Sequence, residues 1–265
     1  MNLTTQMRCL VWVAAIAFWT FGLASSPALA VSQQQLQDIN QLWQGSAHAY
    51  AEVNCSSCHL DTETQALQLQ PTQETCRSCH EGEVDTFLLG KHGIRTLEGM
   101  SPLTPAMAHL PMKAEARDKP QNCNACHDVH SVNTQQAAVD SCLSCHDDSH
   151  SLNYWNSKHG KAWQESASNS DRPSADLVSC STCHLPRETH DEAVFVNHNN
   201  TYTLLPRDRM VKDVCLNCHG LEFSYNSIFD DDLTTANYDR TPTLHHETFD
   251  LVRALEKLRQ GEKAD

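Results

Sequence analysis

The pattern Cys-x-x-Cys-His occurs six times in this chain, and no other sequence feature limits the fold as strongly. The first copy is CSSCH at residues 55–59, and every other CxxC is likewise followed by histidine. Zinc knuckles and redox dithiols need the two cysteines but not the histidine, and zinc would pair two knuckles per ion. Covalent attachment of haem c needs all three residues, because both cysteines bond the porphyrin and the histidine binds its iron. The motifs are Cys55, Cys58 and His59; Cys76, Cys79 and His80; Cys123, Cys126 and His127; Cys142, Cys145 and His146; Cys180, Cys183 and His184; and Cys215, Cys218 and His219.

The cysteine count agrees with six covalently attached haems. The chain has 13 cysteines, and the motifs account for all of them except Cys9. Cys9 lies in a segment that we expect to be removed, so the mature chain has no spare thiol for a disulfide or a catalytic nucleophile.

Residues 1–30 read as a secretory signal. Arg8 provides a positive charge, an apolar run follows at residues 9–24, and a small-x-small site closes it at Ala28–Ala30. An uncleaved membrane anchor is the alternative, and the cleavage site directly after the run disfavours it. We expect a mature protein of residues 31–265, soluble and exported, in the periplasm of a Gram-negative cell or beyond it.

The mature length and composition predict one unusual hexahaem domain over residues 31–265. Aromatic residues make up only 6% of the chain, too few for an ordinary core around six haems. The predicted fold class is therefore mainly α with extensive coil, a multihaem cytochrome c fold in which six covalently bound haems form the core. Without haem, the chain should not hold a compact fold.

Motif spacing predicts how the haems are grouped. Two short linkers and one looser one suggest haem pairs at residues 55–80, 123–146 and 180–219. A helix is expected near the C-terminus, with Phe249, Val252, Leu255 and Leu258 on one face and Gly261 at its end. Strand signals are weak elsewhere.

The second axial ligands are expected from the ten histidines outside the motifs. An aromatic residue, a small residue and a following Ala or Gly recur around three of them, and three others follow a motif closely. The latter should reach a neighbouring haem, because the CxxCH segment already occupies one face of their own. The expected iron ligands are His48, His92, His130, His150, His159 and His190, with His198 next; a solvent-exposed or supporting role is preferred for His109, His245 and His246.

Three segments, CHDDSHSLNYWNSKHG, CSTCHLPRETHD and VCLNCHG, resemble the multihaem cytochrome superfamily of hydroxylamine oxidoreductase, pentahaem nitrite reductase and the tetrahaem cytochromes of ammonia oxidisers. The resemblance runs from about residue 42 to residue 223. It implies a largely helical fold on a closely packed haem chain, with stacked and perpendicular haem pairs. The catalytic role does not carry over, because the CxxCK motif of the reductases is missing and six haems replace the eight of the oxidoreductases. Nothing singles out Tyr154 or Tyr202 as a cross-linking tyrosine.

Two functions fit these features. The first is an electron carrier of a respiratory chain, whose partners are another cytochrome or a membrane quinol-oxidising module. Its formal charge of −14 suits a basic redox partner and disfavours nucleic acid. The alternative is an oxidoreductase acting on a nitrogen or sulfur compound such as hydroxylamine, nitrite or tetrathionate at one five-coordinate haem, with Arg207, Arg209 and Lys212 as a basic funnel. A conducting homo-oligomer or filament is a third reading, with His245 or His246 donated across subunits.

Overall fold

The computed structural model describes residues 31–61, 63–167, 177–190 and 193–261; the predicted secretory segment lies outside them. The described part of the chain is mainly helical, which confirms the mainly α part of the predicted fold class. No helix in the described part is long and apolar enough to cross a bilayer. In chain order the elements are α2 (Gln33–Gln44), α3 (Ala47–Tyr50), α4 (Cys55–His59), α5 (Gln73–Arg77), α6 (Glu81–Leu89), α7 (Ile94–Leu97), η1 (Pro105–Met107), η2 (Ala114–Ala116), α8 (Cys123–Cys126), α9 (Thr134–Ala138), α10 (Asp140–Leu143), α11 (Ser149–Leu152), η3 (Asn153–Asn156), α12 (Lys158–Ala167), α13 (Cys180–His184), β1 (Arg187–His190), β2 (Ala193–Val196), α14 (Asp208–Asp213), η5 (Cys215–Asn217), α15 (Leu221–Phe229), α16 (Asp231–Thr235) and α17 (Glu247–Arg259).

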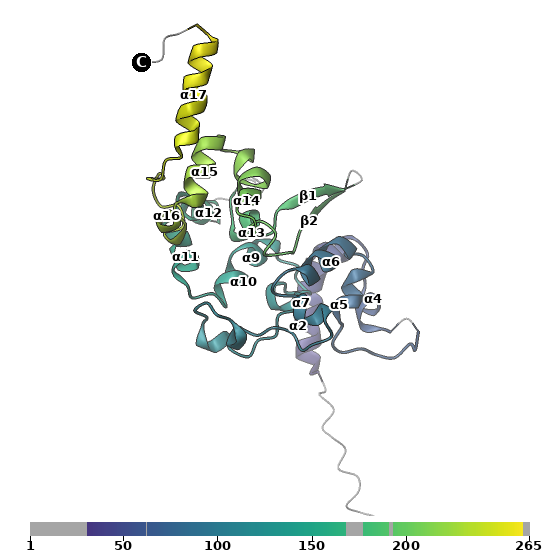
Figure 1. Ribbon diagram of the computed structural model, residues 1–265. Helices are drawn as coiled ribbons and strands as arrows, with labels where there is room; N and C mark the ends of the chain where they lie inside the picture. Colours follow the sequence, from purple (N-terminus) through teal and green to yellow (C-terminus); the bar gives the residue numbers. More distant parts are fainter. Residues whose placement is uncertain (1–30, 62, 168–176, 191–192, 262–265) are drawn as a thin grey trace, which may run out of the picture.

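The short helices are spread along an extended body (Figure 1). Helices α2 to α7 gather in one half, α11 to α16 lie in the other, and α17 projects from the far end. The first and last described helices therefore lie at opposite ends of the molecule.

Few side chains are buried. In the described part, twelve hydrophobic residues are buried, while twenty-four large hydrophobic residues stay exposed. One core cluster consists of Met210, Val211 and Ile228, and Cys183 and Cys215 pack against it. A folded domain normally covers most of its large apolar side chains. Protein atoms alone therefore build only small patches of core here.

In the part of the chain that the structure describes, one β-hairpin interrupts the helices, in a region with weak strand signals. Strand β1 pairs antiparallel with β2, and Arg187 lies opposite Val196. Two strands alone are marginally stable, but the Phe195 ring packs over Gly82 of α6, where a Cβ atom would come within 3.2 Å of the ring. The hairpin thus ties the segment after α13 to α6.

Helix α17 confirms the predicted C-terminal helix, but its apolar residues do not share a buried face. Phe249 packs on Tyr225 of α15, with ring centroids 6.3 Å apart. Val252, Leu255 and Leu258 are 50%, 49% and 60% exposed. Residues three apart drift by about 60° per step around an α-helix, so the stripe winds from the α15 side to the outer side.

Candidate metal centres formed by paired histidines

Each of the six CxxCH histidines faces a second histidine from another part of the chain. The ring centroids of the six pairs are 6.1 to 6.4 Å apart. We number the motifs 1 to 6 in chain order. From motif 1 to motif 6, the pairs are His59–His130, His80–His48, His127–His198, His146–His92, His184–His150 and His219–His159.

The gap between the paired rings fits one metal ion. A metal–imidazole bond is about 2 Å long, and each nitrogen lies roughly 1 Å from its ring centroid, so an ion bound by both rings separates the centroids by about 6 Å. Two rings in direct van der Waals contact would not leave this space. Among the described residues, no three or more His, Cys, Asp or Glu side chains gather to hold an ion.

Five of the six expected second histidines, namely His48, His92, His130, His150 and His159, lie in these pairs. The sixth pair differs from the prediction, because His198 faces His127; the His190 side chain lies outside the described part of the structure. His190 ends β1 opposite Ala193 of β2. The His198 backbone lies beside α6, where its N–H donates to Thr86 Oγ1 at 2.9 Å. The hairpin therefore determines which histidine reaches motif 3.

Local helices bring the cysteines and histidine of a motif to one side. In a helix, residues i, i+3 and i+4 share a face, which matches the spacing of CxxCH. Side chains cap three of these helices: Asn54 for α4, Asn122 for α8 and Ser179 for α13 each accept a backbone N–H of the first turn. The polar residue directly before the first cysteine is the sequence signal for this cap.

The small residue two positions before a second histidine also has a structural role. Ser46 and Ser157 are 1% and 0% exposed. Ser46 Oγ accepts the N–H of Ala49, and Ser157 Oγ accepts that of Gly160. These bonds fix the helix starts that carry His48 and His159. In these two cases helix capping explains the small residue.

Glycines after two of these histidines permit close backbone packing. A Cβ atom on Gly93 would lie 2.3 Å from the Phe87 carbonyl oxygen, and one on Gly160 would lie 2.1 Å from that of Tyr154. Because these neighbours are backbone atoms, they cannot rotate away. Each glycine therefore lets the turn with the histidine fold back on the preceding helical segment.

Backbone carbonyls fix the proton on three of the paired histidines. Nδ1 of His59 lies 2.8 Å from the Gln68 oxygen, that of His198 lies 2.7 Å from Val196 oxygen, and that of His150 contacts Thr234 oxygen. A carbonyl oxygen only accepts, so Nδ1 carries the hydrogen in each case. Nε2 then keeps its lone pair, which is the form in which imidazole binds a metal.

Burial keeps the most enclosed rings neutral. Desolvation, with a smaller contribution from His146, lowers the pKa of His92 to about 4. Desolvation, followed by the effect of His150, lowers the pKa of His184 to about 4. Both imidazoles are thus uncharged at neutral pH, as a metal ligand must be.

Thiols of consecutive motifs influence one another's pKa along the series. Cys123 of motif 3 raises the pKa of Cys76 of motif 2, and Cys180 of motif 5 raises that of Cys142 of motif 4. Between motifs 5 and 6, burial and then the charge on Cys215 raise the pKa of Cys183 to about 12.

The remaining two steps follow the same order. Between motifs 1 and 2, burial first, and then the charges on Cys76 and Cys79, raise the pKa of Cys58. Between motifs 3 and 4, burial and then the charge on Cys142 raise the pKa of Cys126 to about 11. Each motif therefore has a thiol close enough to influence the pKa of a thiol in the next motif, across the long linkers as well as the short ones.

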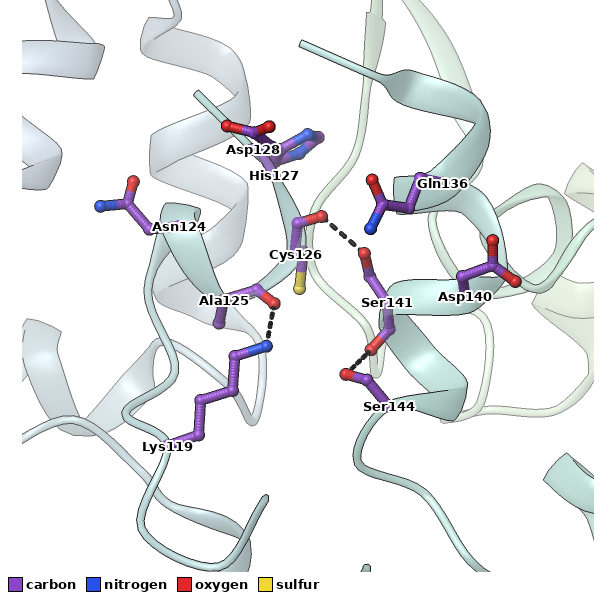
Figure 2. A pocket seen from close by; sticks show the side chains of 10 residues that line it. All are labelled: Lys119, Asn124, Ala125, Cys126, His127, Asp128, Gln136, Asp140, Ser141 and Ser144. Carbon is purple, nitrogen blue, oxygen red and sulfur yellow. Dashed lines mark hydrogen bonds between the residues drawn. The ribbon is translucent and has the colours of Figure 1, made fainter. Parts of the chain in front are cut away.

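A cavity of about 200 Å³ lies between motifs 3 and 4 (Figure 2). Cys126 and His127 line one side, and Ser141 lines the other. Ser141 Oγ donates to the Cys126 carbonyl at 2.6 Å, and Lys119 Nζ donates to that of Ala125 at 2.8 Å. The Ser141 bond links motif 3 to α10, which leads into motif 4, and the Lys119 bond stays within the segment around motif 3.

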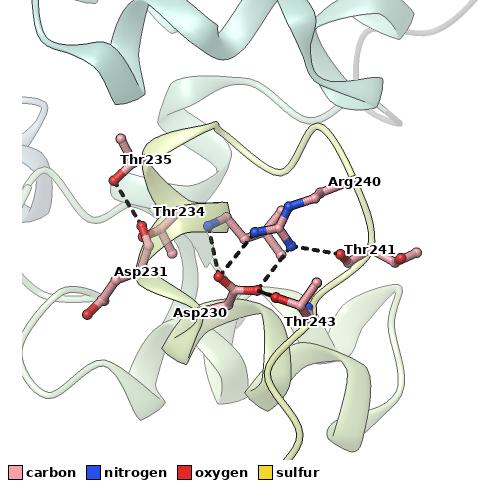
Figure 3. Close-up of polar contacts among 8 residues, drawn as sticks. Asp230, Asp231, Thr234, Thr235, Arg240, Thr241 and Thr243 are labelled. Atoms are coloured by element: carbon pink, nitrogen blue, oxygen red, sulfur yellow. Dashed lines mark hydrogen bonds and ion pairs between the residues drawn. The ribbon is translucent and has the colours of Figure 1, made fainter.

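The segment behind His150 is fastened by a buried carboxylate (Figure 3). Asp230 accepts from Arg240 Nη1 at 3.1 Å, from the Thr243 N–H at 3.0 Å and from the Leu233 N–H at 3.0 Å. The Arg240 bond first, and then these backbone bonds, hold the pKa of Asp230 well below its usual range. The fixed loop presents the Thr234 carbonyl to His150.

Other predicted site residues lie elsewhere. His245 contacts Asp250 at 2.6 Å, and His246 packs against Asn226 and the Tyr225 ring. Both have partners other than a CxxCH histidine, as the supporting role preferred for them implies. In the basic cluster, Arg207 pairs with Asp231 at 2.6 Å, and the Arg209 guanidinium lies 4.9 Å from the Tyr202 ring centroid.

Comparison with known proteins adds no assignment: no protein-family model matches the chain, and a search of curated proteins finds no significant relative.

Proposed function

We propose that this chain is an exported hexahaem c-type cytochrome that carries electrons between redox partners of a respiratory chain. The observation that carries the proposal is the facing histidine at every CxxCH motif. A porphyrin supplies four ligands in a plane and leaves two axial positions on its iron. Each histidine pair supplies two imidazoles at the matching separation, and the adjacent cysteines supply the two thioether attachments.

The same pairing favours a carrier over an enzyme. When bound, haem with two histidine ligands exchanges single electrons at its iron without a free coordination position. An oxidoreductase acting on a nitrogen or sulfur compound would need one CxxCH histidine without a facing ligand. The candidate basic funnel also lends little support to it, because Arg207 and Arg209 are engaged with Asp231 and Tyr202.

Adjacent thiols support a continuous electron path from motif 1 to motif 6. The thiols that would carry successive porphyrins influence one another's pKa at each step, so the porphyrins they would hold lie close together in this proposal. Cys55 of motif 1, Cys79 of motif 2 and Cys218 of motif 6 are exposed, and Cys145 of motif 4 is buried. Partners, another cytochrome or a quinol-oxidising module, would therefore dock near motifs 1 and 2 or near motif 6, aided by the acidic surface.

Haem also accounts for the sparse protein core. Twenty-four exposed large hydrophobic side chains need a cover in water. Six porphyrins attached along the chain would supply apolar area close to the motifs. In this proposal the haems form the apolar core of the protein and also carry its electrons.

The proposal is tested on protein purified from an exporting host. Pyridine haemochrome analysis and mass spectrometry should find six haems on a polypeptide that begins at residue 31. Electron paramagnetic resonance of the oxidised protein should contain only low-spin ferric signals. Free thiols in place of haem would overturn the proposal, and a high-spin signal from about one iron in six would favour the oxidoreductase.

A further inference from the structure

A carboxylate lies beside one of the paired histidines. Asp148 Oδ2 is 3.4 Å from Nδ1 of His146, the motif 4 histidine. The Asp148 side chain is only 16% exposed, so water and salt screen its charge less than they screen a surface charge. At 3.4 Å the contact is at the outer limit of a hydrogen bond, but a charge at this distance acts electrostatically in either case.

This contact distinguishes motif 4 from the other motifs. Where a paired histidine of motif 1, 3 or 5 has an Nδ1 partner, that partner is a neutral carbonyl, at His59, His198 and His150. The other carboxylate near a motif histidine is that of Glu83, whose nearest oxygen is 4.0 Å from Nδ1 of His80, a ring that is 53% exposed. Asp128 Oδ1 accepts the His130 backbone N–H at 3.2 Å. Among the ion pairs of the described residues, the partly buried carboxylate at His146 is the closest one to the ring of a proposed iron ligand.

Asp148 is held in place by α11. It caps this helix, accepting the Ser151 N–H at 3.1 Å and the Ser151 Oγ–H at 2.8 Å. His150, which faces motif 5, is two residues further along the same helix. The negative charge thus lies between proposed ligands of two successive haems and nearest to that of motif 4.

We propose that Asp148 is a positioning residue that lowers the reduction potential of the motif 4 haem relative to the other haems. This inference rests on the proposed haem ligation. A carboxylate near the outer nitrogen of a histidine ligand makes the imidazole a stronger electron donor. The donor and the nearby negative charge both stabilise ferric over ferrous iron. The motif 4 haem would then have a lower reduction potential than its neighbours in the series. In the partly reduced protein, electrons would therefore be held mainly by the haems on either side of it.

The test compares two aspartates that are neighbours in the sequence. Asp148→Asn removes the charge and keeps a residue able to cap α11. Asp147→Asn removes the same charge one residue earlier, from a side chain that is exposed. In a spectroelectrochemical titration at pH 7, we expect one of six one-electron components to move to a more positive potential in Asp148→Asn. The titration of Asp147→Asn should overlay that of the unaltered protein.

Two results would overturn this inference. Equal shifts in both variants would mean that net charge alone acts, and an unshifted titration of Asp148→Asn would mean that the carboxylate does not affect the iron. Asp148→Ser, a second neutral cap, replaces Asp148→Asn should the latter bind fewer than six haems. Haemochrome and spin-state measurements on the unaltered protein test the proposed function separately. If that protein carries six low-spin haems and the Asp148→Asn titration is unshifted, only the inference about Asp148 fails.

Discussion

At the scale of the residue, the prediction from sequence and the structure differ in the histidine that faces motif 3. His190 and His198 follow the same CxxCH motif, and the sequence favours the nearer one. The structure places His198 opposite His127 at 6.1 Å. A single substitution at each position therefore tests how well this geometry describes the protein in solution.

Substitution of His198 should open one iron, and substitution of His190 should open none. In His198→Ala the motif 3 iron loses one axial imidazole, so we expect a high-spin signal from about one haem in six. The matched variant His190→Ala should keep every iron low-spin. Electron paramagnetic resonance and a count of haems per chain give the answer. A high-spin signal in His190→Ala alone would reverse the assignment.

Much of the candidate site could be predicted from local sequence, because the motif chemistry is local. The six CxxCH motifs and five of the second histidines were recognisable from spacing. His198 was not selected, because its approach depends on a hairpin that packs Phe195 against Gly82, more than a hundred residues earlier in the chain. The tertiary structure determines which motif each histidine faces, and the spacing of motifs in the sequence does not predict it.

At the scale of the element, two glycines in similar sequence settings have different surroundings. Gly160 follows His159 and Gly220 follows His219, so each glycine follows one member of the motif 6 pair. Gly160 abuts the Tyr154 carbonyl, whereas a Cβ atom on Gly220 would meet nothing within 4 Å.

Alanine should therefore be costly at Gly160 and well tolerated at Gly220. Overpacking of this kind typically costs about 1–3 kcal/mol, and it outweighs the roughly 1 kcal/mol by which alanine favours a helix over glycine. We expect a lower thermal midpoint for the holoprotein in Gly160→Ala and a small change in Gly220→Ala, where only the N-cap preference of α15 differs. Similar midpoints for the two variants would contradict the close packing of α12 on Tyr154.

The C-terminal helix and the β-hairpin show which features of an element the sequence pattern predicts and which it does not. The C-terminal helix was predictable from apolar spacing and from Gly261, because both are local signals. Its packing was not, because one aromatic ring, Phe249, anchors it to Tyr225 while the later apolar residues turn outward. The β-hairpin was missed for the same reason, since tertiary contact stabilises two strands that would be marginal alone.

At the scale of the whole molecule, the small clusters of buried side chains predict that folding depends on the cofactor. A haem-free chain, made by replacing all twelve motif cysteines with alanine, should lack a cooperative thermal transition in circular dichroism, because little apolar area is buried without porphyrin. The holoprotein, measured in parallel, should unfold cooperatively. A sharp transition in the haem-free chain would contradict a core built from cofactor.

The crossed histidine pairs set an order for assembly. Four second histidines, His48, His92, His150 and His159, precede the motif that they face, and two, His130 and His198, come later in the chain than theirs. For a polypeptide that emerges from its N-terminus through a membrane, four of the proposed irons find both axial partners already outside as soon as they are attached. The proposed irons of motifs 1 and 3 would each have only one histidine ligand until about seventy more residues are exported. During that interval a small molecule could bind at the open position of either iron.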